Sequence, residues 1–478
     1  MNNKSLVTNF IWRFLERCGA QGVTFVVSIV LARLLDPAVY GTVALVTVFT
    51  TIMQVFIESG FGTALIQKKE ADDLDFSTVF YFNIIMSVLL YALMFFTAPL
   101  IAAFYKIEEL TLLIRVMSLS LLVSGVKNVQ QAYISRTMQF KRFFFSTIGA
   151  TISAAVVGIA MAYSGMGVWA LVGQSLTSTA ISTAILWLTV KWRPKKMFSF
   201  ERLKGLFSYG WKLLVSAFLE TVYNDIRQLI IGKMYSSADL AYYNKGKQLP
   251  QLLITNINTS IDSILLPTMS MAQDDVSQVK AMTRRSMKIS TYVMVPIMAG
   301  LAVCAEPLIS FLYTDKWLFC VPYLRIFCFT FMFYPIHTAN LNAMKAMGRS
   351  DLFLKLEIVK KVVGLAAILV TMWHSVMAMA LSLVVTTILN SIINAFPNKK
   401  ILNYGYFEQI KDLLPSILLG VVMGGVVYCI TFLNLPAIIT LLIQVPLGVI
   451  MYISCSIIFK NDNFKYVFST VKGYLKKH

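Results

Sequence analysis

The sequence predicts an all-α polytopic membrane protein with about fourteen transmembrane helices. Hydrophobic residues make up 57% of the 478 positions and charged residues only 14%, and the mean hydropathy is +0.70. Such a composition lies outside the range of soluble globular domains. Apolar stretches of bilayer-spanning length recur along the chain, and basic residues concentrate in alternate connecting segments. These observations together define the fold class.

Fourteen apolar segments are each about 20 residues or longer, which is enough for a helix to cross the hydrocarbon core of a bilayer. They cover residues 10–35, 38–66, 77–104, 110–134, 143–163, 166–190, 207–233, 239–267, 289–313, 319–344, 354–373, 376–396, 413–433 and 435–459.

Basic residues are distributed unequally between the two sets of connecting segments. With the N-terminus inside, the cytoplasmic segments hold 27 Lys and Arg, whereas the outer loops and their edges hold seven. We therefore expect both termini to be cytoplasmic. The same distribution accounts for most of the net charge of +19, which disfavours a nucleic-acid partner.

The chain contains two similar halves. Polar residues of the first span recur 199 positions later in the seventh, where Arg13, Arg17, Gln21, Thr24 and Ser28 correspond to Lys212, Ser216, Glu220, Tyr223 and Arg227. A matching turn follows each span, at residues 33–41 and 233–241, now offset by 200. We therefore predict an N-lobe at 1–198 with spans 1–6 and a C-lobe at 199–399 with spans 7–12. Residues 400–478 hold spans 13–14 and a basic tail.

Eight of the 42 basic residues lie in the predicted spans and are not counted with the connecting segments or their edges: Arg13, Arg17, Lys127, Lys212, Arg227, Arg325, Lys360 and Lys361. A charge at membrane depth costs about 2.5 to 3.5 kcal/mol on insertion scales, so such residues face protein or water. At 100° per residue, the polar positions of the seventh span fall within an arc of about 80°. This stripe is interpreted as the wall of an aqueous cavity.

Arg13, Arg17, Lys212 and Arg227 are the candidate anion-binding residues of this cavity, and Gln21 and Tyr223 lie on the same two arcs. The alternative is internal neutralisation by Glu16 and Glu220. Arg325 is a further candidate, with the capping of an outer helix end as its alternative role.

Glu58, Glu220 and Asp262 are candidates for proton or sodium coupling, because a carboxylate in a low-dielectric cleft can titrate near the working pH. Their alternative role is that of salt-bridge partners. No phosphate-binding P-loop and no metal-spaced His/Cys/Asp cluster occurs, so we expect no cofactor other than a coupling H⁺ or Na⁺. With no long extramembrane segment for a catalytic domain, any transport should draw on an ion gradient or on the gradient of the substrate.

Four stretches resemble the polysaccharide transporter branch of the multidrug/oligosaccharidyl-lipid/polysaccharide (MOP) flippase superfamily, in particular its Wzx-type, colanic-acid-exporter-like members of lipopolysaccharide biosynthesis. They are residues 32–41 (ARLLDPAVYG), 59–69 (SGFGTALIQKK), 131–143 (QAYISRTMQFKRF) and 315–325 (DKWLFCVPYLR). The chain departs from the family at residues 236–241, where a Gly-Pro pair and a later Gly are more usual.

The resemblance implies two six-helix lobes related by a pseudo-twofold axis, plus two C-terminal helices. It also implies a central cavity bordered by spans 1, 2, 7 and 8 that opens alternately to the two sides. The implied substrate is an oligosaccharide repeat unit on a polyprenyl pyrophosphate, moved to the periplasmic leaflet of the bacterial inner membrane for capsule, exopolysaccharide or O-antigen assembly. A monomeric transporter that works with a polysaccharide polymerase and a chain-length regulator would fit this role.

Two other functions remain open at this point. A cation-coupled multidrug exporter of the same superfamily should have a more acidic or aromatic cavity. A membrane glycan polymerase, which is an enzyme, should have a long outer loop with arginines, whereas the outer loops here are short. We therefore expect a transporter and not an enzyme.

Overall fold

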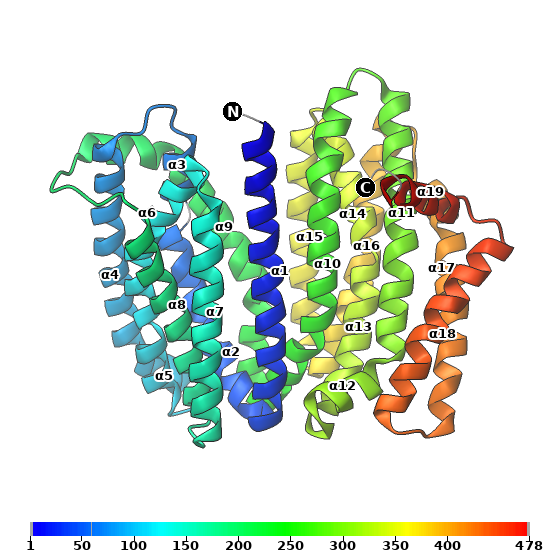
Figure 1. Cartoon of the computed structure of the whole chain (residues 1–478), viewed down its shortest axis with the longest axis horizontal. Helices are drawn as coiled ribbons and strands as arrows, with labels where there is room; N and C mark the ends of the chain where they lie inside the picture. Colours follow the sequence, from blue (N-terminus) through cyan, green and yellow to red (C-terminus); the bar gives the residue numbers. More distant parts are fainter. Residues whose placement is uncertain (1–2, 59, 476–478) are drawn as a thin grey trace. The chain divides into compact units, whose positions relative to one another are not determined.

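A computed structural model describes residues 3–58 and 60–475, except for the side chains of residues 3–11, 13, 14, 209, 260, 470, 471 and 473–475. The described residues form helices joined by short turns, and none of them belongs to a β-strand (Figure 1). The all-α fold is therefore confirmed. Internal contacts divide the chain into two compact units, unit 1 (Met1–Ala241) and unit 2 (Tyr242–His478). The lobes assigned to 1–198, 199–399 and 400–478 stay a prediction from sequence similarity.

Unit 1 contains nine helices within the described part of the chain. They are α1 (Asn3–Leu34), α2 (Pro37–Glu58), α3 (Phe61–Gln67), α4 (Asp73–Tyr105), α5 (Leu110–Met117), α6 (Leu119–Thr137), α7 (Phe140–Tyr163), α8 (Val168–Thr189) and α9 (Phe200–Met234).

Helix α10 (Ser237–Met271) begins in unit 1 and continues into unit 2. The other helices of unit 2 are α11 (Val276–Val303), α12 (Ala305–Tyr313), η1 (Asp315–Cys320), α13 (Val321–Met332), α14 (Tyr334–Ala346), α15 (Ser350–Thr371), α16 (Val376–Ile401), α17 (Tyr406–Cys429), η2 (Ile430–Leu433), α18 (Ala437–Ile458) and α19 (Asp462–Leu475).

Each of the fourteen predicted spans coincides with one helix or with consecutive helices. Eleven segments of the described chain are long and apolar enough to cross a membrane. The other three predicted spans coincide with α9, α10 and α15, whose sequences are more polar. Several spans are broken: Gly60 separates α2 from α3 with a positive φ of 96°, and Pro335 stands in the first turn of α14, just after α13 ends.

The turns at the ends of α1 and α9 repeat as the sequence predicts. Helix α1 ends at Leu34 and α2 begins at Pro37, whereas α9 ends at Met234 and α10 begins at Ser237, an offset of 200 at both boundaries. The two turns also touch. A Cβ added to Gly41 would lie 1.7 Å from the carbonyl oxygen of Ser237, so only glycine fits at position 41.

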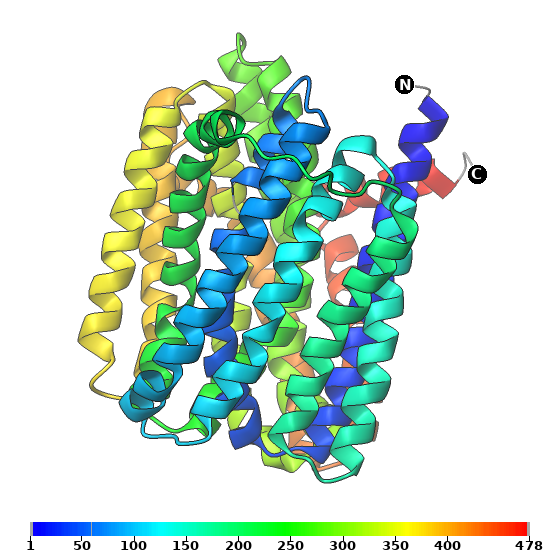
Figure 2. The same cartoon turned by 90° about the vertical axis from the view of Figure 1, so that its left-hand side faces the viewer.

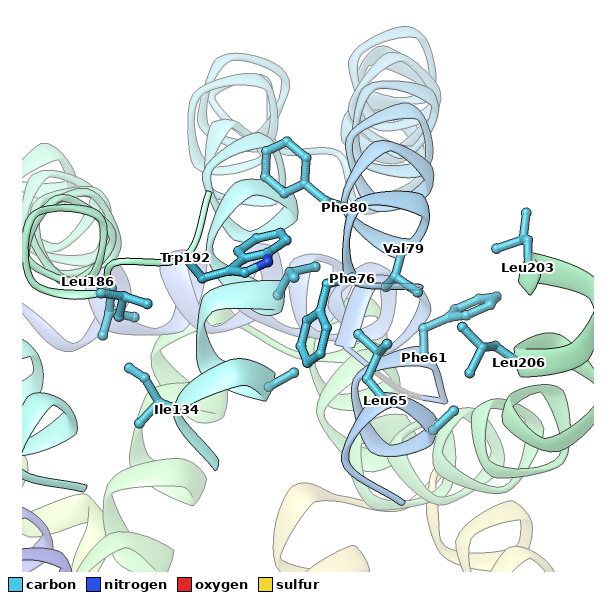
Figure 3. Packing of buried hydrophobic residues seen from close by; sticks show 14 of the residues in the cluster. Phe61, Leu65, Phe76, Val79, Phe80, Ile134, Leu186, Trp192, Leu203 and Leu206 are labelled. Carbon is cyan, nitrogen blue, oxygen red and sulfur yellow. The ribbon is translucent and has the colours of Figure 1, made fainter. Parts of the chain in front are cut away.

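Unit 1 has an aromatic core beneath the segment that joins α8 to α9, residues 190–199. Figure 2 shows this segment crossing the ends of the helices of unit 1. The side chain of Trp192 enters the core, where its ring centroid lies 5.6 Å from that of Phe76 (Figure 3). The Trp192 indole N–H donates to Asp73 Oδ1 at 3.1 Å, and Gln130 Nε2 donates to the Trp192 carbonyl at 3.2 Å. These contacts hold the segment that leads into α9.

In unit 2, α17 and α18 pack side by side, and α19 packs against both α11 and α18 (Figure 1). Gly420 permits close approach of α17 to α11, because a Cβ there would lie 2.2 Å from Val295 Cγ1. The hydroxyl of Tyr452 donates to the Tyr292 carbonyl at 2.8 Å, which ties α18 to α11. The two C-terminal spans are therefore integral to the packing of unit 2.

Candidate functional site

Helix α9 carries the predicted polar stripe as one continuous helix. Lys212 and Glu220 are exposed, Tyr223 is half-buried and Arg227 is only 8% exposed. Lys212 and Arg227 are 15 residues apart, which at 1.5 Å per residue separates them by about 22 Å along the axis. Two adjacent phosphates cannot bridge that distance. The two cations therefore mark different depths along the helix.

Lys212 and Arg227 also differ in their surroundings. Within the described part of the chain, Lys212 makes no hydrogen bond, ion pair or ring contact. Arg227 is enclosed and has an interaction partner. Lys212 is therefore accessible to a ligand, whereas the enclosed position of Arg227 fits a role in packing the C-terminal part of α9.

On α1, the exposed Arg17 is likewise without a hydrogen-bond or ion-pair partner among the described residues. Gln21, one turn further along, is half-buried and has a partner. Glu16 is buried against α7, where it accepts a hydrogen bond from Thr147 Oγ1 at 2.9 Å. The side chain of Arg13 lies outside the described residues, so its predicted role stays a prediction.

Arg325 lies near the start of α13 in unit 2. Its Nε donates to the carbonyl of Ala302 at 3.2 Å, and its Nη2 lies 3.9 Å from Glu306 Oε2. Ala302 is in the last turn of α11, whose carbonyls lack intrahelical partners. This geometry fits the capping role that the sequence left open for Arg325.

Each of the three coupling candidates accepts a hydrogen bond from a side-chain amide in its own unit. Gln54 Nε2 donates to Glu58 at 2.6 Å, Asn224 Nδ2 to Glu220 at 3.1 Å, and Asn342 Nδ2 to Asp262 at 2.6 Å. All three carboxylates are exposed. They are thus oriented by neutral donors and reachable by an ion.

Unit 2 contains an apolar cavity of about 400 Å³ between α11, α12, α17 and α18. Its lining includes Gly300, Met423, Gly448 and Tyr452, and its one amide, Gln444, leaves Oε1 without a hydrogen bond. This volume falls in the range of small-molecule sites. The sequence is apolar throughout, so apolar residues on separate helices give no signal that they line a cavity. Sequence reasoning therefore missed this cavity.

Metal binding has no support among the residues that the structure describes, because no three His, Cys, Asp or Glu side chains converge there. The feature that stands out is electrostatic. Among the described residues, Arg17 and Lys212 are cations without partners on helices that coincide with predicted membrane spans, and each would cost about 2.5 to 3.5 kcal/mol in hydrocarbon. Their exposed faces must therefore be wet, and such cations bind phosphate oxygens by charge-assisted hydrogen bonds.

Comparison with known proteins identifies the chain. Residues 30–322, more than half of its length, match the family described as polysaccharide biosynthesis protein. The chain belongs to this family. Over 416 residues it is 24% identical to the teichuronic acid biosynthesis protein TuaB of Bacillus subtilis, covering 84% of this chain and 85% of the relative. It is 21% identical to the lipopolysaccharide biosynthesis protein WzxC of Escherichia coli, covering 90% and 85% of the two chains.

Among solved structures, the fold is similar to that of the lipid II flippase MurJ in an inward closed conformation. The TM-score is 0.76 at 16% identity, and the match covers 95% of this chain and 99% of the other. Family and fold together place the chain in the MOP flippase superfamily, as the sequence resemblance implied. The chain is accordingly a membrane transporter and not an enzyme. This excludes the alternative of a membrane glycan polymerase.

Proposed function

We propose that this protein is a flippase that moves a polyprenyl-pyrophosphate-linked oligosaccharide repeat unit from the cytoplasmic to the periplasmic leaflet of the bacterial inner membrane. The exported unit serves the assembly of a surface polysaccharide. The observation that carries the proposal is a pair of exposed cations, Arg17 and Lys212, which have no partner among the described residues and lie on predicted membrane spans of a MOP-family chain.

The chemistry of the substrate fits these residues. A pyrophosphate and a sugar head cannot enter hydrocarbon without replacement of their hydration. Fixed cations on a wet face supply that replacement for the phosphates, and cations at several depths supply it in steps along the path. The apolar cavity of unit 2 offers a second kind of site, suited to part of a hydrocarbon chain.

Transport proceeds by alternating access, with antiport of H⁺ or Na⁺ as the driving reaction. Glu58, Glu220 and Asp262 are the coupling residues in this proposal, because each is exposed and held by a side-chain amide. The protein acts as a monomer with both termini in the cytoplasm, and a polymerase and a chain-length regulator take up the flipped unit. Transport in vesicles that is indifferent to collapse of both the proton and the sodium gradients would contradict the antiport.

The decisive experiment uses a strain from which the gene is deleted. We expect lipid-linked repeat units to accumulate on the cytoplasmic leaflet and surface polysaccharide to be lost. Complementation with the unchanged gene should restore both, whereas Arg17→Ala or Lys212→Ala should not. Absence of lipid-linked intermediates in the deletion strain would refute the flippase proposal.

The competing function is a cation-coupled multidrug exporter. Minimum inhibitory concentrations of cationic dyes and drugs in the same deletion strain separate the two functions. A flippase predicts unchanged drug sensitivity together with loss of polysaccharide, and an exporter predicts the reverse.

A further inference from the structure

Helix α6 carries a lysine within a predicted membrane span, and no described residue forms an ion pair with it. Lys127 is half-buried, about ten residues or 15 Å along α6 from the helix end at Thr137. It has no hydrogen bond or ion pair with any residue that the structure describes. An unpaired ammonium kept at this depth indicates a ligand that arrives from water.

The charged residue that interacts electrostatically with Lys127 is Glu58, at the end of α2. Glu58 acts on Lys127 electrostatically without forming a direct ion pair, and it is held instead by Gln54 Nε2 at 2.6 Å. The neighbouring Asn128 donates from Nδ2 to the carbonyl of Ile57 at 2.6 Å. The end of α2 is thus tied to α6 by a neutral hydrogen bond beside the two charged residues.

Helix α9 places Lys212 near the end of α2, because the two helices approach each other closely next to both charged residues. The backbones of Gly60 and Gly210 touch, because a Cβ on Gly60 would lie 2.5 Å from the Gly210 carbonyl oxygen. Glu58 precedes Gly60 by two residues and Lys212 follows Gly210 by two, so both charged residues lie close in sequence to this contact. Lys127, Glu58 and Lys212 together carry a net charge of +1 around this contact.

We propose that Lys127 is an anion-binding residue of unit 1 that takes the pyrophosphate of the lipid-linked substrate, with Glu58 as its counter-charge when the site is empty. This inference rests on the proposed function. It adds to that function one binding residue and the chemical group that this residue binds, where α2 packs against α6 and α9. The two phosphates compete with Glu58 for the field of Lys127, so removal of the carboxylate strengthens anion binding. No bond is made or broken, and only charge pairing changes.

The test measures binding of farnesyl pyrophosphate and of inorganic pyrophosphate to the purified full chain in nanodiscs. We expect Lys127→Gln to weaken binding about tenfold, Lys127→Arg to stay within about threefold of the unchanged protein, and Glu58→Gln to tighten binding several-fold. Lys191→Gln is the matched control, because Lys191 is an exposed lysine of the 190–199 segment with no contact of its own among the described residues.

The opposite signs at Lys127 and Glu58 separate an anion site from a structural role, in which both substitutions would only lower the melting temperature. If Lys127→Gln weakens binding of farnesyl pyrophosphate but not of inorganic pyrophosphate, Lys127 binds the pyrophosphate only when a lipid is attached to it. Equal weakening for both probes shows that Lys127 binds the pyrophosphate group itself. Unchanged binding of both probes by Lys127→Gln overturns the inference.

The complementing strain distinguishes failure of this inference from failure of the proposed function. If Lys127→Gln restores surface polysaccharide fully while Lys212→Ala does not, the flippase proposal stands and the role of Lys127 is refuted. If the deletion strain accumulates no lipid-linked units, the function itself fails.

Discussion

Lys212 and Arg227 lie on one helix and one polar stripe, yet the structure predicts opposite consequences for their removal. Lys212 is exposed and unpartnered among the described residues, so Lys212→Gln should alter the free energy of unfolding by less than about 0.5 kcal/mol. Arg227 is enclosed and has an interaction partner, so Arg227→Gln should cost about 0.5 to 3 kcal/mol because it removes that interaction from an enclosed site. The same substitution therefore reports two different roles.

Transport should show the reverse order when corrected for the amount of folded protein. If Lys212 contacts a phosphate, its loss removes about 1.5 to 3 kcal/mol of charge-assisted binding, or about 10- to 150-fold in affinity. Lys212→Arg keeps the charge and should retain most of the activity. Arg227→Gln should act mainly through the amount of folded protein.

Each variant requires two measurements. One is the melting temperature of the purified protein in detergent, and the other is the restoration of surface polysaccharide in the deletion strain. An equal fall in melting temperature for Lys212→Gln and Arg227→Gln would refute the structural distinction. Full restoration by Lys212→Gln at normal expression would refute the assignment of Lys212 to substrate binding.

Three further outcomes are expected. Gly448→Leu should fill the apolar cavity of unit 2 and weaken binding of long-chain polyprenyl pyrophosphates, measured against farnesyl pyrophosphate, which should be unaffected. Gly60→Ala should lower the melting temperature, because the φ of 96° and the Gly210 backbone leave no room for a Cβ; Gly205→Ala, with open space around it, should raise it slightly. Arg136→Ala should expose the α3 segment to proteolysis in inverted vesicles, because its guanidinium donates to four backbone carbonyls at residues 65–69, and Arg136→Lys should protect only in part.

Much of the architecture was predictable because lipid imposes strong rules on sequence. Every predicted span coincides with helical structure, and the turns after α1 and α9 fall 200 residues apart as expected. The break at Gly60 within the second predicted span was harder to see. Its signal is the run Ser-Gly-Phe-Gly, since two glycines in an apolar segment indicate a backbone position that other residues cannot adopt.

The candidate site was less predictable from the sequence than the fold. Helical periodicity correctly places Lys212, Glu220 and Tyr223 on one helix with a shared polar face, because spacing alone fixes which side chains lie on the same arc. Periodicity cannot tell an open cation from an enclosed one, and it treats Lys212 and Arg227 alike. It also gives no reason to connect Lys127 with Glu58, since these residues are brought together only when α6 packs on α2.

The sequence by itself determined that this chain is a helical membrane protein, because the bilayer penalises every unpaired backbone group and every misplaced charge. Its division into two related halves stays a prediction from the sequence repeat. Tertiary packing decided which of the described cations are exposed and which are enclosed, and where the apolar cavity of unit 2 lies. Burial and partnership depend on contacts between helices distant in sequence. The packing of α9 with α2 and α4 in unit 1 is of this kind, although the sequence repeat places α9 at the start of the second half.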